Sequence, residues 1–119
     1  MTNKEFGKRL EDRTKDFAIQ IIKLSRAIPK TDEGRVIKNQ ISKSGTSVGA
    51  NYREANRARS VADFRNKIKI SESEASETVY WLEIIEKMDW VEQERLDGVK
   101  KEAKEILALF ASIAYGAKK

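Results

Sequence analysis

The sequence of 119 residues contains no cysteine and no histidine. Without cysteine there is no disulfide framework and no thiolate chemistry, so the fold does not depend on an oxidising compartment. Without histidine the chain lacks the commonest metal ligand and the side chain that most often acts as a general base near neutral pH. We therefore expect a protein that is not an enzyme and that binds no cofactor, no metal and no small-molecule substrate.

Proline occurs once and glycine six times, whereas alanine, glutamate, lysine, isoleucine and serine are abundant. This mixture favours helices and disfavours a turn-rich β fold. No apolar run reaches the length of a membrane span, and residues 1–10 lack the apolar centre of a signal peptide. The chain length is that of a common single domain. We expect one domain over residues 1–119, in the cytoplasm of a prokaryote and without a membrane partner.

Apolar residues recur at three- and four-residue steps in four segments, and no segment alternates in the manner of a strand. The first helix should end before Pro29, because a residue that precedes proline is disfavoured in helical conformation. Thr31 or Asp32 should cap the second helix. Ser60 and Asp63 resemble a capping box that opens the third, with aspartate in place of the usual glutamate. The predicted helices cover about residues 3–28, 33–57, 60–88 and 92–117.

Each predicted helix carries an apolar stripe that should face a shared core. Short links between long helices favour antiparallel neighbours, so the sequence predicts an all-α, up-down-up-down four-helix bundle. The core stripes, in chain order, are Phe6, Leu10, Phe17, Ile21, Leu24 and Ile28; Ile37, Ile41, Gly45, Val48, Tyr52 and Ala55; Phe64, Ile68, Ser71, Ala75, Val79, Leu82 and Ile85; and Leu96, Val99, Ala103, Ile106, Phe110, Ile113 and Ala117.

Two glycines, Gly45 and Gly49, stand one helical turn apart among serine, threonine and alanine residues. Each glycine inside a helix costs roughly 1 kcal/mol relative to alanine, so a compensating gain is needed. Close approach of another backbone supplies such a gain. The alternative is that the glycines break the helix and form a loop. We favour a continuous helix, because Tyr52 continues the phase of Ile37 and Ile41.

The charge is divided along the chain, although the net charge is only +5. Between residues 30 and 69 there are ten lysines or arginines against four acidic residues. Between residues 71 and 97 there are nine acidic residues against two basic ones. Such a division indicates either an anionic partner or charge-complementary self-association.

The basic stretch predicts a surface that binds the phosphates of RNA or DNA. Arginine suits phosphate because its planar fork donates two hydrogen bonds at once, and such contacts are non-specific and salt-dependent. The alternative is that each basic residue pairs with an acidic residue of the third or fourth helix, within or between subunits. For the group as a whole we favour nucleic acid. The predicted contact residues are Lys43, Arg53, Arg57, Arg59, Arg65, Lys67 and Lys69.

A second apolar line runs beside the core stripe of the third helix. A bundle helix needs only one core face, so this line predicts burial against another subunit and hence a homo-oligomer. The alternative is a wide core stripe in a monomer. The predicted interface residues are Ile70, Trp81, Ile84 and Met88.

Carboxylates occur as pairs at Glu74 with Glu77 and at Glu83 with Glu86. Metal sites in helical bundles normally combine glutamate with histidine three residues later, and this chain has no histidine. Glu54, next to Arg53, should stay ionised and would be a poor acid or base near neutral pH. These carboxylates therefore do not change the expectation of a protein without catalytic activity.

Four segments resemble one known family: Ile28–Ile37, Gln40–Ala55, Asp63–Phe64 and Tyr80–Leu82. The family comprises the small four-helix-bundle proteins encoded in intervening sequences of bacterial 23S ribosomal RNA genes. The resemblance covers essentially the whole chain. The family is similar in fold to the accessory proteins of diversity-generating retroelements, which form pentameric barrels and engage a reverse transcriptase and nucleic acid.

The resemblance implies a left-handed antiparallel four-helix bundle that forms a homopentamer, and it implies no established activity. One departure lies in the link 88–91, which has no glycine before its aromatic residue and leaves the shape of that turn open. We expect a non-enzymatic, oligomeric bundle that binds RNA or DNA through its basic surface. The alternative is a protein-interaction scaffold whose divided charge serves the assembly of subunits or of a partner protein.

Overall fold

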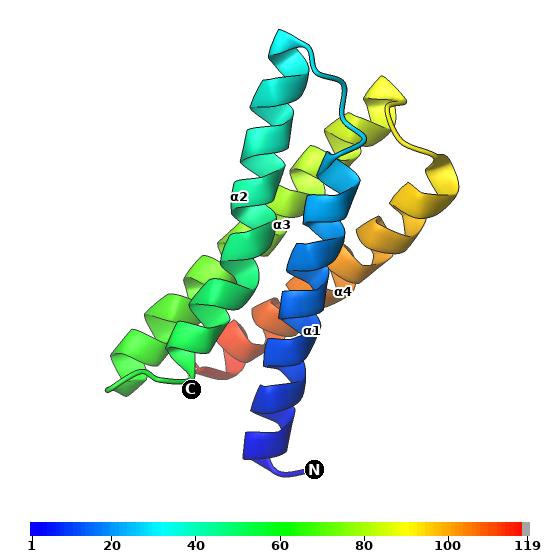
Figure 1. Ribbon diagram of the computed structural model, residues 1–119. Coiled ribbons are helices and arrows are strands. Elements are labelled where there is room, and N and C mark those ends of the chain that lie inside the picture. Colours follow the sequence, from blue (N-terminus) through cyan, green and yellow to red (C-terminus); the bar gives the residue numbers. More distant parts are fainter. Residues whose placement is uncertain (118–119) are drawn as a thin grey trace.

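The computed structural model describes the backbone of residues 1–117 as four helices joined by short links, with no strand in that part of the chain (Figure 1). The side chain of Ala117 and residues 118 and 119 lie outside the described part. The all-α class and the number of helices are as predicted. The helices are α1 (Asn3–Ser25), α2 (Asp32–Ala55), α3 (Val61–Met88) and α4 (Gln93–Ala117).

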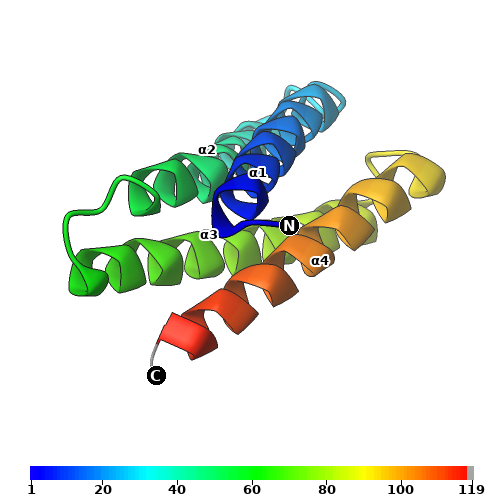
Figure 2. The same cartoon turned by 90° about the horizontal axis from the view of Figure 1, so that it is seen from below.

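Consecutive helices make the main contacts of the fold. α2 packs along both α1 and α3, and α3 packs along α4, whereas α1 and α4 touch over a much shorter stretch. In Figure 1 the α3–α4 pair is inclined to the α1–α2 pair, and Figure 2 shows α3 between α2 and α4. α1 and α3 therefore occupy diagonal positions, without close backbone contact in the described residues.

The helix starts follow the capping residues of the sequence. The Thr31 hydroxyl accepts a hydrogen bond from the Gly34 N–H at 3.1 Å, and the Ser60 hydroxyl accepts one from the Asp63 N–H at 3.0 Å. Each hydroxyl satisfies a backbone donor that has no partner within the first helical turn. Of the two predicted caps of α2, the structure selects Thr31.

Two of the predicted helices extend further at their C-terminal ends than the helices in the structure. α1 ends at Ser25 instead of Ile28, and α2 ends at Ala55 instead of Arg57. In both links the chain continues with hydrogen bonds to the third preceding residue, such as Ile28 N–H to Ser25 O at 3.2 Å and Arg57 N–H to Glu54 O at 3.0 Å. Helix ends commonly tighten in this way, and an apolar periodicity does not distinguish such a turn from a further α-helical turn.

Asp89 gives the link between α3 and α4 its shape. It has φ 60° and ψ 36°, the left-handed conformation, and it is the only described non-glycine residue with positive φ. Its N–H bonds the Glu86 carbonyl at 3.2 Å. Aspartate tolerates this conformation better than most residues, so it can take the C-terminal position that glycine usually fills. The absence of glycine from this turn is thereby explained.

The core is formed by the predicted stripes, with one exception at the start of the chain. Phe6, in the first turn of α1, is 40% exposed. The rings of Tyr52 and Phe110 meet edge to face, with centroids 5.3 Å apart. Ile37, Phe64, Val79 and Ile113 are only partly buried. The largest fully buried side chains include Phe17, Ile21, Leu24, Ile41, Val48, Ile68, Leu82, Ile85, Leu96, Ile106 and Phe110.

The two glycines of α2 allow close approach of α1. A Cβ atom on Gly45 would lie 2.7 Å from Cγ2 of Ile21, and one on Gly49 would lie 2.9 Å from Oγ1 of Thr14. Both distances are shorter than carbon and oxygen atoms tolerate. α2 is continuous through both positions, so the loop alternative is wrong and the packing interpretation is confirmed.

Buried hydroxyl groups line the opposite side of α2, where it meets α3. The Ser71 hydroxyl donates to the Val48 carbonyl at 3.0 Å, and the Thr78 and Ser44 hydroxyls lie 2.9 Å apart. No buried side-chain nitrogen or oxygen among the described residues lacks a hydrogen-bond partner. Small polar side chains therefore let α2 and α3 approach without an unsatisfied group, which would be costly in the core.

Replacing Gly45 with alanine should lower the free energy of unfolding. The added methyl group would overlap Ile21, and overpacking of this kind typically costs about 1–3 kcal/mol, more than the helix-propensity gain of about 1 kcal/mol. Gly98→Ala is the matched control, because nothing lies within 4 Å of its added Cβ and only the propensity gain remains. Urea denaturation followed by circular dichroism measures both. A Gly45→Ala variant as stable as Gly98→Ala would contradict the packing role.

Candidate nucleic-acid interface

A groove between α1 and α2 carries four exposed cationic side chains. Lys8 and Lys15 belong to α1, Arg53 belongs to α2, and Arg57 lies in the turn that follows α2. The rest of the groove is lined mostly by small residues, together with two acidic residues. These lining residues are Glu11, Asp12, Thr14, Ala18, Thr46, Gly49 and Ala50.

The helix geometry explains why these four cations meet. Lys8 and Lys15 are two helical turns apart and lie on one face of α1. Arg53 lies in the last turn of α2, and the guanidinium of Arg57, in the turn that follows, donates to the Arg53 carbonyl at 3.5 Å. Gly49 sits against Thr14 at the centre of the groove and brings the two helices together. The contact that closes the α1–α2 packing therefore also places the two cationic pairs across one groove.

The acidic residues of the groove are already engaged. Asp12 Oδ2 lies 3.6 Å from Lys8 Nζ, and Glu11 accepts a hydrogen bond from the Asn56 side chain at 2.9 Å. Within residues 1–117, neither Lys15 nor Arg53 forms an ion pair. The groove therefore retains a positive charge that an external anion can neutralise.

The seven predicted contact residues do not all line one groove. Arg53 and Arg57 share the α1–α2 groove, whereas Lys69 lines a different groove beside Glu72 and Glu77. Arg59 is exposed in the link between α2 and α3. The others are Lys43, exposed on α2, and Arg65 and Lys67, partly buried on α3.

Lys8 and Lys15 were not among the predicted contact residues. Their seven-residue spacing could have placed them on one face of the first helix. Nothing in the sequence indicates that this face lies beside Arg53 and Arg57, because that depends on the packing of Gly49 against Thr14.

Two cations outside the predicted basic stretch, Arg13 and Lys100, form ion pairs with acidic residues of another helix. Arg13 of α1 donates to both carboxylate oxygens of Glu102 of α4, at 2.9 and 2.6 Å, and to Glu105 at 3.0 Å. The hydrogen bond to Glu102 is the main reason that the pKa of Arg13 is raised. Lys100 bonds Glu86 at 2.7 Å. Arg53, Arg57 and Arg59 form no ion pair in the described part of the chain.

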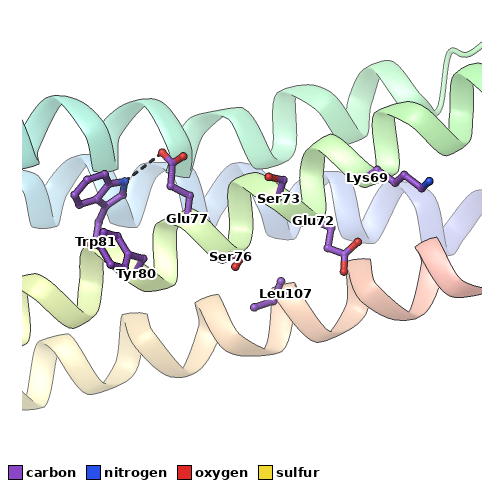
Figure 3. A pocket seen from close by; sticks show the side chains of 8 residues that line it. All are labelled: Lys69, Glu72, Ser73, Ser76, Glu77, Tyr80, Trp81 and Leu107. Carbon is purple, nitrogen blue, oxygen red and sulfur yellow. Dashed lines mark hydrogen bonds between the residues drawn. The ribbon is translucent and has the colours of Figure 1, made fainter.

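A second groove lies on the outer side of α3 along α4, and Figure 3 shows its side chains. The serine pair Ser73 and Ser76 lies in the middle, with the aromatic pair Tyr80 and Trp81 at one end and Lys69 at the other. The Trp81 indole N–H donates to Glu77 at 3.2 Å, and its ring meets that of Tyr80 edge to face at 5.0 Å. We call this surface the α3 groove; its lining is Lys69, Glu72, Ser73, Ser76, Glu77, Tyr80, Trp81 and Leu107.

The predicted interface residues are exposed to different degrees. Ile70, Trp81 and Ile84 are partly buried within one chain, and Met88 is 47% exposed. Tyr80, which the prediction did not include, is 54% exposed next to Trp81. An apolar surface is thus present on α3, and it extends round the helix to Tyr80.

No group of three or more acidic side chains in the described residues is arranged to hold a metal ion. The carboxylate pairs of α3 lie on different sides of the helix, and Glu86 bonds Lys100 and Gln93 of the α4 side. None of the described helices has the length and apolar character needed to cross a membrane.

Four packed helices with an exposed basic groove define a small helical-bundle protein. A model of the family described as 23S rRNA-intervening sequence protein matches residues 9–112, and the chain belongs to this family. A solved structure from Bacteroides thetaiotaomicron, described as a protein with unknown function from the S23 ribosomal protein family, is 38% identical to it, with a TM-score of 0.80. The match covers 87% of this chain and 96% of that one. No curated protein matches the chain.

Replacing Glu74 or Glu86 with glutamine should change stability in opposite directions at neutral pH. Burial, and then the Glu77 charge, raise the pKa of Glu74, so its ionised form is unfavourable in the folded state and Glu74→Gln should stabilise. Hydrogen bonds from Lys100 and Gln93 lower the pKa of Glu86, so its ionised form favours folding above the unfolded pKa and Glu86→Gln should destabilise.

Both differences should shrink in acid. The penalty at Glu74 fades as the pH falls through its raised pKa, and the benefit of Glu86 is lost as the pH falls through its lowered pKa. Urea denaturation from pH 7 to about pH 3, across the ordinary glutamate pKa of about 4.3, measures both trends. Glu54→Gln, at an exposed position of α2, is the control. Equal effects of the Glu74 and Glu86 substitutions at pH 7 would contradict this assignment.

Proposed function

We propose that the protein is a non-enzymatic homo-oligomer that binds RNA or DNA through the α1–α2 groove. One observation carries the proposal: four cations from α1, α2 and the turn after α2 line one groove, and Lys15 and Arg53 have no acidic partner in the described chain. The phosphate backbone of a nucleic acid supplies negative charges at regular intervals that suit such a row.

The side chains of the groove suit phosphate more than bases. Arg53 and Arg57 can each donate two hydrogen bonds to a phosphate, and Lys8 and Lys15 add point charges. No aromatic residue lines the groove, so it offers no platform on which bases could stack. We therefore propose binding that depends little on sequence and strongly on salt. The name of the family refers to 23S rRNA, which makes RNA the first ligand to test.

The alternative function is a protein-interaction scaffold whose basic and acidic regions complement each other between subunits or with a partner protein. It predicts that the assembly dissociates in high salt and that the protein does not bind nucleic acid. Nucleic acid is favoured because the arginines of the α1–α2 groove and of the adjoining link form no ion pair with the described residues.

We further propose that the helices form a left-handed antiparallel up-down-up-down bundle and that five copies assemble into a homopentamer. Short links support the helix directions, and the family resemblance supports the handedness and the number of copies. Exposed aromatic and apolar side chains on α3 support burial against another subunit. We place the protein in the cytoplasm, since without cysteine it does not depend on an oxidising compartment.

Substituting Arg53 and Arg57 together with alanine should weaken binding to RNA and lower its salt dependence. Each lost phosphate contact should reduce the slope of log K against log salt by about 1, and the pair should reduce affinity roughly tenfold or more at low salt. Fluorescence anisotropy with labelled single-stranded and duplex RNA and DNA, over a range of salt concentrations, measures both quantities.

Two further double variants locate the interface. Lys101→Ala with Lys104→Ala removes two exposed cations of α4 and should change binding little. Lys67→Ala with Lys69→Ala tests the part of the predicted surface on α3. Equal losses from all three pairs would mean that net charge, not the groove, governs binding. No binding of the wild-type protein to any RNA or DNA at low salt would overturn the nucleic-acid function and favour the scaffold.

The wild-type protein should have a mass near five times its chain mass of 13.6 kDa in multi-angle light scattering at micromolar concentration. Trp81→Asp should lower that mass, because it places a charge in the apolar surface of α3. Circular dichroism must show that the variant keeps its helices, since Trp81 also packs against the core. A wild-type mass of one chain would refute the oligomer.

A further inference from the structure

The α3 groove has the shape and composition of a helix-docking surface. Ser73 and Ser76 form a floor of small side chains, and Leu107 and the Tyr80–Trp81 pair provide apolar walls (Figure 3). Small residues between larger ones let a second helix approach closely and insert its side chains, as in ridges-into-grooves packing. Its charged residues are Lys69 and Glu72 at one end and Glu77 towards the other, which give the groove a net negative charge.

The second half of α1 and the residue that follows it carry a complementary set of exposed residues. Ile19 and Ile22 are 43% and 40% exposed, although isoleucine is normally buried. Asp16 precedes them, and Lys23 and Arg26 follow them, all exposed and without an ion pair in the described chain. We call these five residues the α1 patch. Along the helix its charge changes from negative to positive, and its net charge is positive, opposite to that of the α3 groove.

The two surfaces also match in spacing. Asp16 and Lys23 are seven residues apart, and Lys69 and Glu77 are eight apart, which is about 10.5 and 12 Å along a helix. With the two helices parallel, Ile19 and Ile22 would lie over the serine floor. Asp16 would then lie beside Lys69, and Lys23 would lie beside Glu77. Arg26 would reach the Tyr80 ring, a favourable cation–π position.

We infer that the α3 groove of one copy receives the α1 patch of the next copy, with the two helices parallel. This inference rests on the proposed homo-oligomer and specifies its contact. α1 and α3 are diagonal in the fold, so each chain presents the two surfaces on different sides and cannot satisfy them within itself. The contact is heterologous, and each added copy leaves one groove and one patch available until the assembly closes.

Two blocking variants test the contact. Ser76→Arg fills the floor of the α3 groove, and Ile22→Asp places a charge in the α1 patch; both positions are exposed, and Val61→Asp is a control outside both surfaces. Each blocked variant alone should have the mass of one chain in light scattering, and the control should keep the wild-type mass. An equimolar mixture of the two blocked variants retains one intact groove and one intact patch, so it should have twice the chain mass.

The charged residues at the end of the contact provide a second test, in which no apolar residue is replaced. Glu77→Lys and Lys23→Glu should each lower the wild-type mass, and the double variant should restore it because the pair is exchanged. This test also applies if either blocking variant loses its helical circular dichroism. A failure of the double variant to recover would overturn the proposed register.

The outcomes separate this inference from the proposed oligomer. A monomeric wild-type protein refutes the oligomer itself. If both blocking variants remain oligomeric, the proposed homo-oligomer stands, and the contact proposed here is overturned. Two monomeric variants that stay monomeric when mixed would mean that the intact groove does not bind the intact patch, and this result also overturns the head-to-tail contact.

Discussion

The close approach of α1 to α2 at Gly45 and Gly49 is the constraint on which the rest of the structure depends. At these positions the α2 backbone lies against Ile21 and Thr14, with no room for a Cβ atom. On its other side α2 meets α3 through Ser44, and through Ser71 and Thr78 of α3, whose hydroxyls bond across the contact. α2 is thus narrow on both sides, and this narrowness brings its two neighbours into the positions that shape both the core and the basic groove.

The distribution of ion pairs determines which charges stay available. Arg13 and Lys100 hold acidic residues of α3 and α4, while Lys15 and Arg53 remain without partners in the described chain. Exposed ion pairs contribute little to stability, typically less than about 1 kcal/mol. Leaving these groove cations unpaired therefore costs the fold little, and the basic stretch remains available to an anionic ligand.

Nucleic-acid binding and assembly use successive parts of α1. Lys8 and Lys15 line the groove with α2, whereas Ile19 and Ile22 lie further along the helix. Several linked grooves would bind one long nucleic acid with a higher effective affinity than a single copy, because each contact after the first is intramolecular.

The sequence alone determined the all-α class, the four helices and most of the buried stripes, because apolar periodicity, Pro29 and the hydroxyl caps are local signals. It also indicated that the glycines of α2 serve packing, since Tyr52 keeps the helical phase across them. The sequence could not show that Lys8 and Lys15 join Arg53 and Arg57, or that Lys69 lies in a separate groove. These lysines and arginines are distant along the chain, and they become neighbours because Gly49 packs against Thr14. Only the tertiary structure decided the membership of the candidate site, because helix packing, not the order of residues, determines which cationic side chains face one another.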